Sequence, residues 1–191
     1  MMSINTTDSR FEVLLGDVTL GQRGDLLQHA ARPGEQVTVG VLEEEAQTAI
    51  VEAGAQIVLN FNHFWRQVSG RLPADQLTAT LSRLLLNPST GAPLTGSEEE
   101  LSPSEGRISV FVGGDGRQNF VNIADATLND SGVYSMEVCS QRGTPEEVCE
   151  RAEITLFVLD RELLKSLKVM PMIDLYPNSQ WDPSPWSAAA L

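Results

Sequence analysis

The fold is decided by the stretch from Ile123 to Cys139, which reads IADATLNDSGVYSMEVC. Within it, Asp130, Gly132 and Tyr134 stand at alternate positions, and Met136 continues the alternation. Apolar residues at every second position are typical of a β-strand that buries one face. An acidic residue and a glycine directly before such a strand predict a turn. The stretch therefore predicts a tight corner that leads into a half-buried strand.

The motif Asp130-x-Gly132-x-Tyr134 resembles the corner between strands E and F of immunoglobulin-like domains. In that family the tyrosine hydroxyl bonds back to the upstream backbone. Arg107 and Asp130 are similar in spacing to the arginine–aspartate pair at the base of variable-type domains. The resemblance implies an all-β fold, an immunoglobulin-like antiparallel β-sandwich. It also implies that these four residues have structural roles.

The resemblance covers residues 43–160, slightly more than the ~100 residues usual for such a domain. Residues 1–42 and 161–191 are expected to be irregular extensions, with a strand-like run at 36–42 and a short helix within 161–170. The first extension is either the end of a preceding domain or an added strand, and the last residues form a flexible tail containing proline and tryptophan. The further strands expected inside the domain are 54–61, 77–86, 107–112, 121–123 and 154–158.

The expected core departs from the family pattern at two places. Family members usually carry a disulfide between strands B and F, and its two positions here hold Phe61 and Met136, an apolar pair. The core tryptophan of strand C has no counterpart at the usual spacing, so Ala79 or Leu81 is expected in its place. The segment 77–86 also fits a helix, because its leucines recur at helical spacing.

The two cysteines are expected to face each other. The alternation that points Tyr134 and Met136 inward points Cys139 outward, and the same alternation around Ile154 points Cys149 outward. Facing residues of an antiparallel pair come close enough for a disulfide. We therefore predict a Cys139–Cys149 bond that closes the hairpin between strands F and G in an oxidising compartment. The alternative is a pair of free thiols.

The loop between the cysteines lies where variable domains place a principal recognition loop. A disulfide at its base would hold the loop in one shape and so lower the conformational entropy that the loop loses on binding. The alternative is an ordinary hairpin tip. The contact residues expected in this loop are Gln141, Arg142, Glu146 and Glu147.

The segment Asn62–Arg66 is expected in the B–C loop, at the same end of the domain. Trp65 and Arg66 are of the types that often anchor protein interfaces. In a second interpretation, which we favour, Phe64 and Trp65 fold back and close the core in place of the missing tryptophan.

Several short motifs carry weak information. Asn5-Thr6-Thr7 is a sequon for N-glycosylation, and Asn129-Asp130-Ser131 is a second one. Arg23-Gly24-Asp25 matches the tripeptide that integrins recognise, although three residues often match by chance. His29 and His63 lie in segments without a nucleophile motif, and the cysteine spacing fits no zinc site. We therefore expect neither an enzyme nor a bound cofactor or metal.

Composition limits the class of partner. The chain has 191 residues, of which 41% are hydrophobic, and a net charge of −13. This charge argues against nucleic acids and anionic membrane surfaces, which attract Lys and Arg. No stretch of ~18 apolar residues suits a bilayer, and the N-terminus does not resemble a signal peptide. We therefore expect no membrane insertion, and a fragment of a larger chain.

Together these patterns favour a non-enzymatic recognition or adhesion module of an extracellular or cell-surface protein. The expected partner is another protein, including a second copy of the same chain. The alternative is a cytoplasmic structural module, like those of muscle and cytoskeletal proteins. The missing B–F disulfide and the missing signal peptide favour that alternative.

Overall fold

The computed structural model describes residues 11–15, 18–22, 25–26, 32–41, 47–72, 77–113 and 118–171. The strands before residue 90 are β1 (Phe11–Leu15), β2 (Val18–Gln22), β3 (Asp25–Leu26), β4 (Gln36–Gly40), β5 (Gln47–Glu52), β6 (Gln56–Asn60) and β7 (Leu77–Leu85). The later strands are β8 (Glu99–Glu100), β9 (Ile108–Val112), β10 (Asn119–Ile123), β11 (Gly132–Ser140), β12 (Val148–Leu159) and β13 (Leu167–Pro171). Helices are α1 (Asn62–Arg71), α2 (Arg161–Lys165) and the 3-10 turn η2 (Leu128–Asp130). Among these helices, none is long and apolar enough to cross a membrane.

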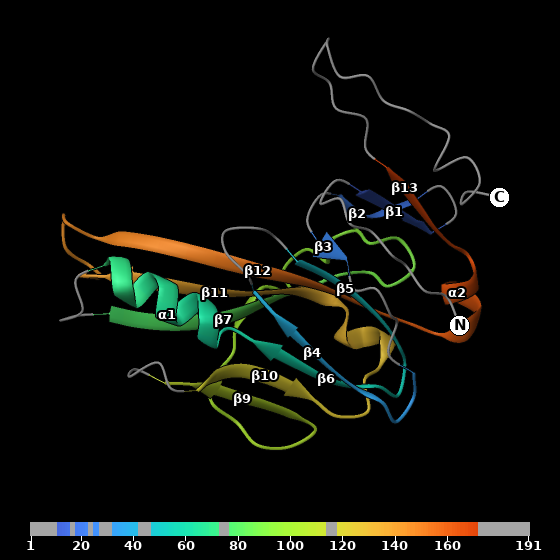
Figure 1. Ribbon diagram of the computed structural model, residues 1–191, viewed down its shortest axis with the longest axis horizontal. Helices are drawn as coiled ribbons and strands as arrows, with labels where there is room; N and C mark the ends of the chain where they lie inside the picture. Colours follow the sequence, from blue (N-terminus) through green and yellow to red (C-terminus); the bar gives the residue numbers. More distant parts are fainter. Residues whose placement is uncertain are drawn as a thin grey trace, which may run out of the picture.

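Two sheets pack face to face and form the sandwich (Figure 1). One has four strands in the order β4-β6-β10-β9, and the other has six in the order β3-β5-β12-β11-β7-β8. Strand β11 pairs antiparallel with β12 on one side and with β7 on the other along its whole length. Strand β5 joins β12 in parallel. The predicted all-β sandwich is therefore confirmed.

Alternation along the strands builds the core. Ile57 and Leu59 of β6 and Ile154 of β12 are fully buried, while their neighbours along each strand are more exposed. From Leu156 to Leu159 every residue of β12 is buried. Phe61 and Met136, which the sequence resemblance puts at the inter-sheet disulfide positions, are fully buried in the same cluster. Such burial contributes roughly 1.5–3 kcal/mol for each large apolar side chain.

The segment 77–86 is a strand, not a helix, because β7 pairs residue by residue with β11. Leu81 is only 1% exposed and belongs to the core cluster, whereas Ala79 is half-buried at its edge. Leu81 is thus the more deeply buried of the two residues expected in the tryptophan's place.

The strand-like run expected at 36–42 is present as β4. The expectation that the rest of both extensions is irregular is wrong for the residues that the structure describes. Strands β1, β2 and β13 form a separate sheet in the order β13-β1-β2, and β3 adds to the sandwich beside β5. The predicted C-terminal helix ends at Lys165, and Leu167 begins β13. Leu15 and Leu167 are buried in a second apolar cluster with Ile50 and Phe157 of the sandwich, which explains why the extensions are ordered there. Asn5, Arg23-Gly24 and the tail after Pro171 lie outside the described residues.

The predicted corner is present with all its bonds. Arg107 donates two hydrogen bonds to Asp130, Nη1 to Oδ2 at 2.7 Å and Nη2 to Oδ1 at 2.9 Å. The backbone N–H of Thr127 donates to the same carboxylate at 2.8 Å, which closes the turn of η2. The Tyr134 hydroxyl donates to the carbonyl oxygen of Asp130 at 2.7 Å. Burial alone would raise the pKa of Asp130, but the bonds from Arg107 and Thr127 outweigh burial and lower its pKa.

Gly132 is expected from the sequence to be a turn residue, but it has a different role in the structure. It is the first residue of β11, and its φ is not among the positive values found in the described residues. A Cβ atom at this position would lie 2.7 Å from the carbonyl oxygen of Leu84 on β7. Glycine is therefore required by the close approach of two backbones.

Replacing Tyr134 with phenylalanine should lower the free energy of unfolding by about 1–2 kcal/mol, because the buried carbonyl of Asp130 loses its donor. Burial also raises the pKa of Tyr134 to about 12, so the hydroxyl keeps its proton over the usual pH range. Urea denaturation of the wild type and Tyr134→Phe at neutral pH measures the difference. A change below about 0.3 kcal/mol would show that the bond contributes nothing net.

Candidate functional site

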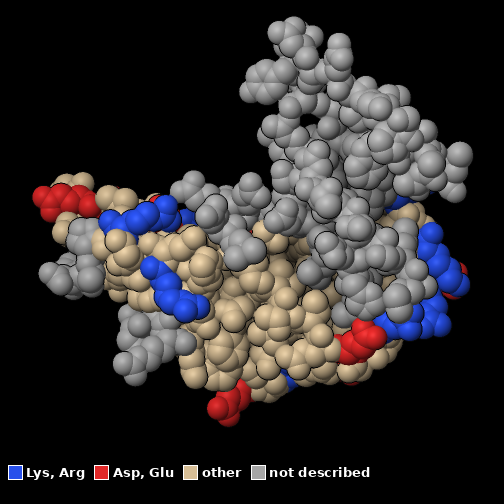
Figure 2. Space-filling view, viewed as in Figure 1, with Lys and Arg blue, Asp and Glu red and all other residues tan. Residues whose placement is uncertain are grey.

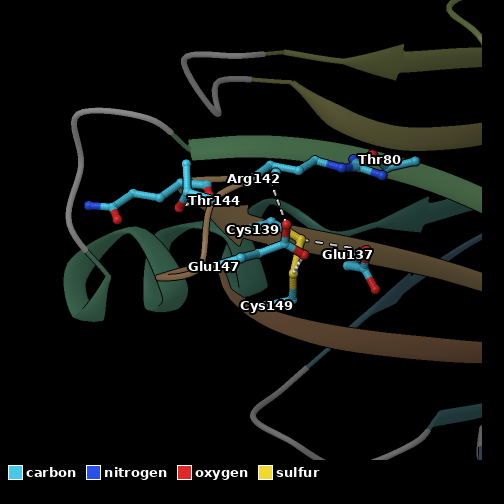
Figure 3. The surroundings of a disulfide bond; sticks show 9 residues. Thr80, Glu137, Cys139, Arg142, Thr144, Glu147 and Cys149 are labelled. Atoms are coloured by element: carbon cyan, nitrogen blue, oxygen red, sulfur yellow. Dashed lines mark hydrogen bonds between the residues drawn. A yellow bond between two sulfur atoms is a disulfide. The ribbon is translucent and has the colours of Figure 1, made fainter.

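The hairpin between β11 and β12 ends in the loop 141–147, which we call the F–G loop. Cys139 and Cys149 are direct partners in the strand register and form a disulfide, with their Cα atoms 4.1 Å apart (Figure 3). The predicted disulfide is therefore confirmed. Cys139 is buried and Cys149 is exposed, so one sulfur of the bond lies close to solvent.

Hydrogen bonds inside the F–G loop hold its shape. Gly143, with a φ of 83°, takes a conformation that side chains disfavour, and its N–H donates to Glu147 Oε2 at 2.6 Å. Thr144 Oγ1 donates to the carbonyl oxygen of Gln141 at 2.8 Å. Arg142 reaches back from the loop and donates from Nη1 to Thr80 Oγ1 on β7 at 2.9 Å (Figure 3). The F–G loop is thus held at its base by the disulfide, within itself by the bonds of Gly143 and Thr144, and against β7 by the bond of Arg142.

The four residues expected to contact a partner therefore differ in role. Arg142, Glu146 and Glu147 are exposed, and Gln141 is half-buried. The side chains of Arg142 and Glu147 are used in the bonds that hold the loop. Glu146 contributes only its backbone N–H, which donates to Thr144 Oγ1 at 3.3 Å. Among the described residues of this loop, Glu146 is thus the charged side chain with the freest access to a partner.

The segment expected as the B–C loop begins a helix instead. Helix α1 buries Phe64, Trp65 and Val68 on one side, the spacing of an amphipathic helix. It ends at Arg71 because Leu72 precedes a proline, and that position disfavours helical backbone. Sequence reasoning missed the helix because its apolar residues were assigned singly, not by their helical spacing.

Trp65 is only 6% exposed, so it packs on the core and is not a surface anchor. The favoured interpretation, in which Phe64 and Trp65 close the core, is confirmed, and the assignment of Trp65 as a contact residue is corrected. Arg66 lies on the opposite side of α1 and is exposed. Figure 2 shows cationic side chains on this outer side of the helix.

Helix α1 and the F–G hairpin form one end of the molecule. Arg71 Nη2 of the helix lies 3.3 Å from Glu150 Oε2 of β12, next to the disulfide. At the start of the helix, Asn62 Oδ1 accepts a hydrogen bond from the backbone of Asn119 at 2.8 Å. These bonds position α1 beside the loop, so that the helix and the loop present a common surface.

One grouping of possible metal ligands occurs among the described residues, and it consists of Glu137, Cys139 and Cys149. The two sulfurs are bonded to each other and offer no thiolate pair. Glu137 Oε1 lies 3.5 Å from Cys139 Sγ, and Glu147 Oε1 lies 3.3 Å from Cys149 Sγ. These carboxylates place negative charge beside the disulfide, where it would repel an attacking thiolate.

Replacing both Cys139 and Cys149 with serine should lower the free energy of unfolding by about 2–3 kcal/mol, the chain-entropy value for so short a loop. Chemical denaturation without reductant measures this difference in unfolding free energy. Addition of reductant to the wild type should lower its unfolding free energy by the same amount. A variant as stable as the oxidised wild type would show that the bond adds no stability.

No protein-family model matches this chain, and no curated protein matches it.

Proposed function

We propose that this chain is an immunoglobulin-like recognition module of an extracellular or cell-surface protein, and that it binds another protein. The observation that carries the proposal is the F–G loop, which is exposed from Arg142 onward and yet fixed by a disulfide and by internal hydrogen bonds. A loop that already holds one shape loses little conformational entropy on binding. Exposed loops on a rigid sandwich are a common place for recognition.

The proposed contact surface combines Glu146 of the loop with Arg66 of α1. Both are exposed, and they carry opposite charges, so a partner with a complementary pattern would be oriented by them. Arg142 and Glu147 hold the loop in position, and their loss would act on binding through the shape of the loop.

The same bond supports the proposed compartment. Disulfides persist in oxidising surroundings and are rare in the cytosol, which supports an extracellular location. The second candidate is an intracellular structural module, favoured by the buried Phe61 and Met136 at the usual inter-sheet disulfide positions. Such a module would need neither the disulfide nor a fixed loop.

Fluorescent tetramers of the chain, applied to cells of the source tissue, test the proposal. Wild-type tetramers should stain a subset of cells, and Glu146→Arg should reduce the staining at least several-fold. The matched control is Glu162→Arg on α2, which makes the same charge change at a side chain that is 84% exposed and should leave staining unchanged. Equal staining by both variants would place the contact elsewhere and contradict the proposal.

A further inference from the structure

The outer face of the four-stranded sheet carries no charged residue on its strands. The residues of β4, β6, β10 and β9 that alternate with the core residues point outward. All of these outward residues are uncharged: they are glutamine, threonine, glycine, valine, asparagine, serine or phenylalanine. Those near the middle of the sheet are Thr38, Val58, Asn60, Phe111, Phe120 and Asn122. By contrast, the outward residues of the six-stranded sheet include Glu137, Arg151 and Glu153.

Two aromatic rings lie on this uncharged face. Phe111 of β9 and Phe120 of β10 are direct partners across the strands, and their ring centroids are 4.6 Å apart. Both rings are half-buried, so part of each faces solvent. A depression beside Phe111 marks the edge of the uncharged face, because Glu105 lines it together with Pro103 and Gln118. Aromatic residues together with few charges are the composition found in the centre of protein interfaces.

The charge of the whole chain indicates which partner fits this face. With a net charge of −13, two copies repel each other wherever their acidic surfaces approach. In a two-fold contact each residue near the axis meets its own counterpart, so a charged residue there would face an identical charge. The four-stranded sheet removes that penalty because its outward positions are neutral. We propose that two copies of this chain associate through the outer face of β4, β6, β10 and β9.

This contact is separate from the F–G loop and leaves that end of each copy free. Four strands of five residues cover an area well below the roughly 800 Å² that each partner gives to a standard interface. The dimer should therefore be weak, with a dissociation constant of about 10–500 µM. Since the interface itself is uncharged, salt acts only by screening the general repulsion. Raising NaCl from about 50 to 500 mM should tighten the dimer several-fold.

Sedimentation equilibrium of the full chain, from about 5 µM to 1 mM at both salt concentrations, tests the proposal. Asn122→Lys and Thr38→Lys place a charge at exposed positions of the face and should weaken the dimer at least tenfold. Thr95→Lys, at an exposed turn that follows β7 of the other sheet, changes the net charge equally and should leave the dimer intact or tighten it. Asn122→Glu and Thr95→Glu repeat the comparison with the opposite sign. Circular dichroism melts confirm that each variant is folded.

Three results would overturn the proposal. A chain that remains monomeric up to 1 mM at both salt concentrations has no such contact. A dimer that salt weakens is held by charge pairs and uses another surface. Equal loss of the dimer in the variants at 122 and 95 would likewise exclude this face.

Discussion

Gly132→Ala is expected to lower the free energy of unfolding by about 2–4 kcal/mol, the range of an overpacked backbone contact. The added Cβ would lie 2.7 Å from the carbonyl oxygen of Leu84, and a backbone atom cannot rotate away as the end of a side chain can. Strands β7 and β11 would have to separate at the pair Gly132–Leu85, where the ladder between these two inner strands begins. Urea denaturation with tryptophan fluorescence measures the loss.

The matched control is Gly70→Ala in helix α1, where a Cβ meets nothing within 4 Å. Alanine favours helix over glycine by up to about 1 kcal/mol, so this variant should be more stable than the wild type. The same chemical change thus has opposite signs at the two positions. Equal effects of the two substitutions would contradict the backbone approach at Gly132.

Arg107→Ala is expected to destabilise the fold by about 3 kcal/mol at neutral pH. The Asp130 carboxylate, only 4% exposed, would lose both hydrogen bonds from the guanidinium and remain buried without its counter-charge. The Arg107 side chain is 44% exposed, so its own burial adds little to the loss. Arg32→Ala, at an exposed position before β4, removes the same charge and should change the stability by less than about 0.5 kcal/mol.

The pH dependence separates the ion pair from simple loss of packing. Because the folded state lowers the pKa of Asp130, the pair contributes fully above the pKa of the unfolded chain, about 3.9, and its contribution falls as the pH drops towards the lower folded pKa. In Arg107→Ala the buried carboxyl of Asp130 lacks the guanidinium that lowers its pKa, so it takes up a proton at a higher pH than in the wild type. The difference in unfolding free energy between the wild type and Arg107→Ala should therefore be largest at neutral pH and shrink as the pH falls towards about 3. A difference that stays constant down to pH 3 would show that the lost interaction is not electrostatic.

The corner could be predicted from the sequence because its chemistry is local and specific. Asp130 and Tyr134 lie four positions apart, so one short turn brings the hydroxyl to the carbonyl. The disulfide was predictable for a similar reason, since alternation along β11 and β12 places both cysteines on one face. Neither inference needed long-range packing beyond the pairing of neighbouring strands.

The missed elements depend on tertiary contacts. Helix α1 is held by burial of Phe64, Trp65 and Val68 against a core that only the folded sandwich provides. Strands β1 and β13 are more than 150 residues apart in the sequence, and neither has a local signal for its partner. The role of Gly132 was missed because the approaching atom belongs to Leu84, a residue of another strand. Short motifs predict local corners, but they do not predict which distant backbone comes close.

The disulfide between Cys139 and Cys149 is expected to fix the F–G loop in the compartment in which the protein acts. The most direct test is to alkylate Cys139 and Cys149 in protein taken from its native source, before and after reduction, and to determine the masses of the peptides. The account predicts that both thiols are blocked from alkylation until a reductant is added. Free thiols in the unreduced native protein would contradict the fixed loop and the extracellular location, and would favour the intracellular structural module.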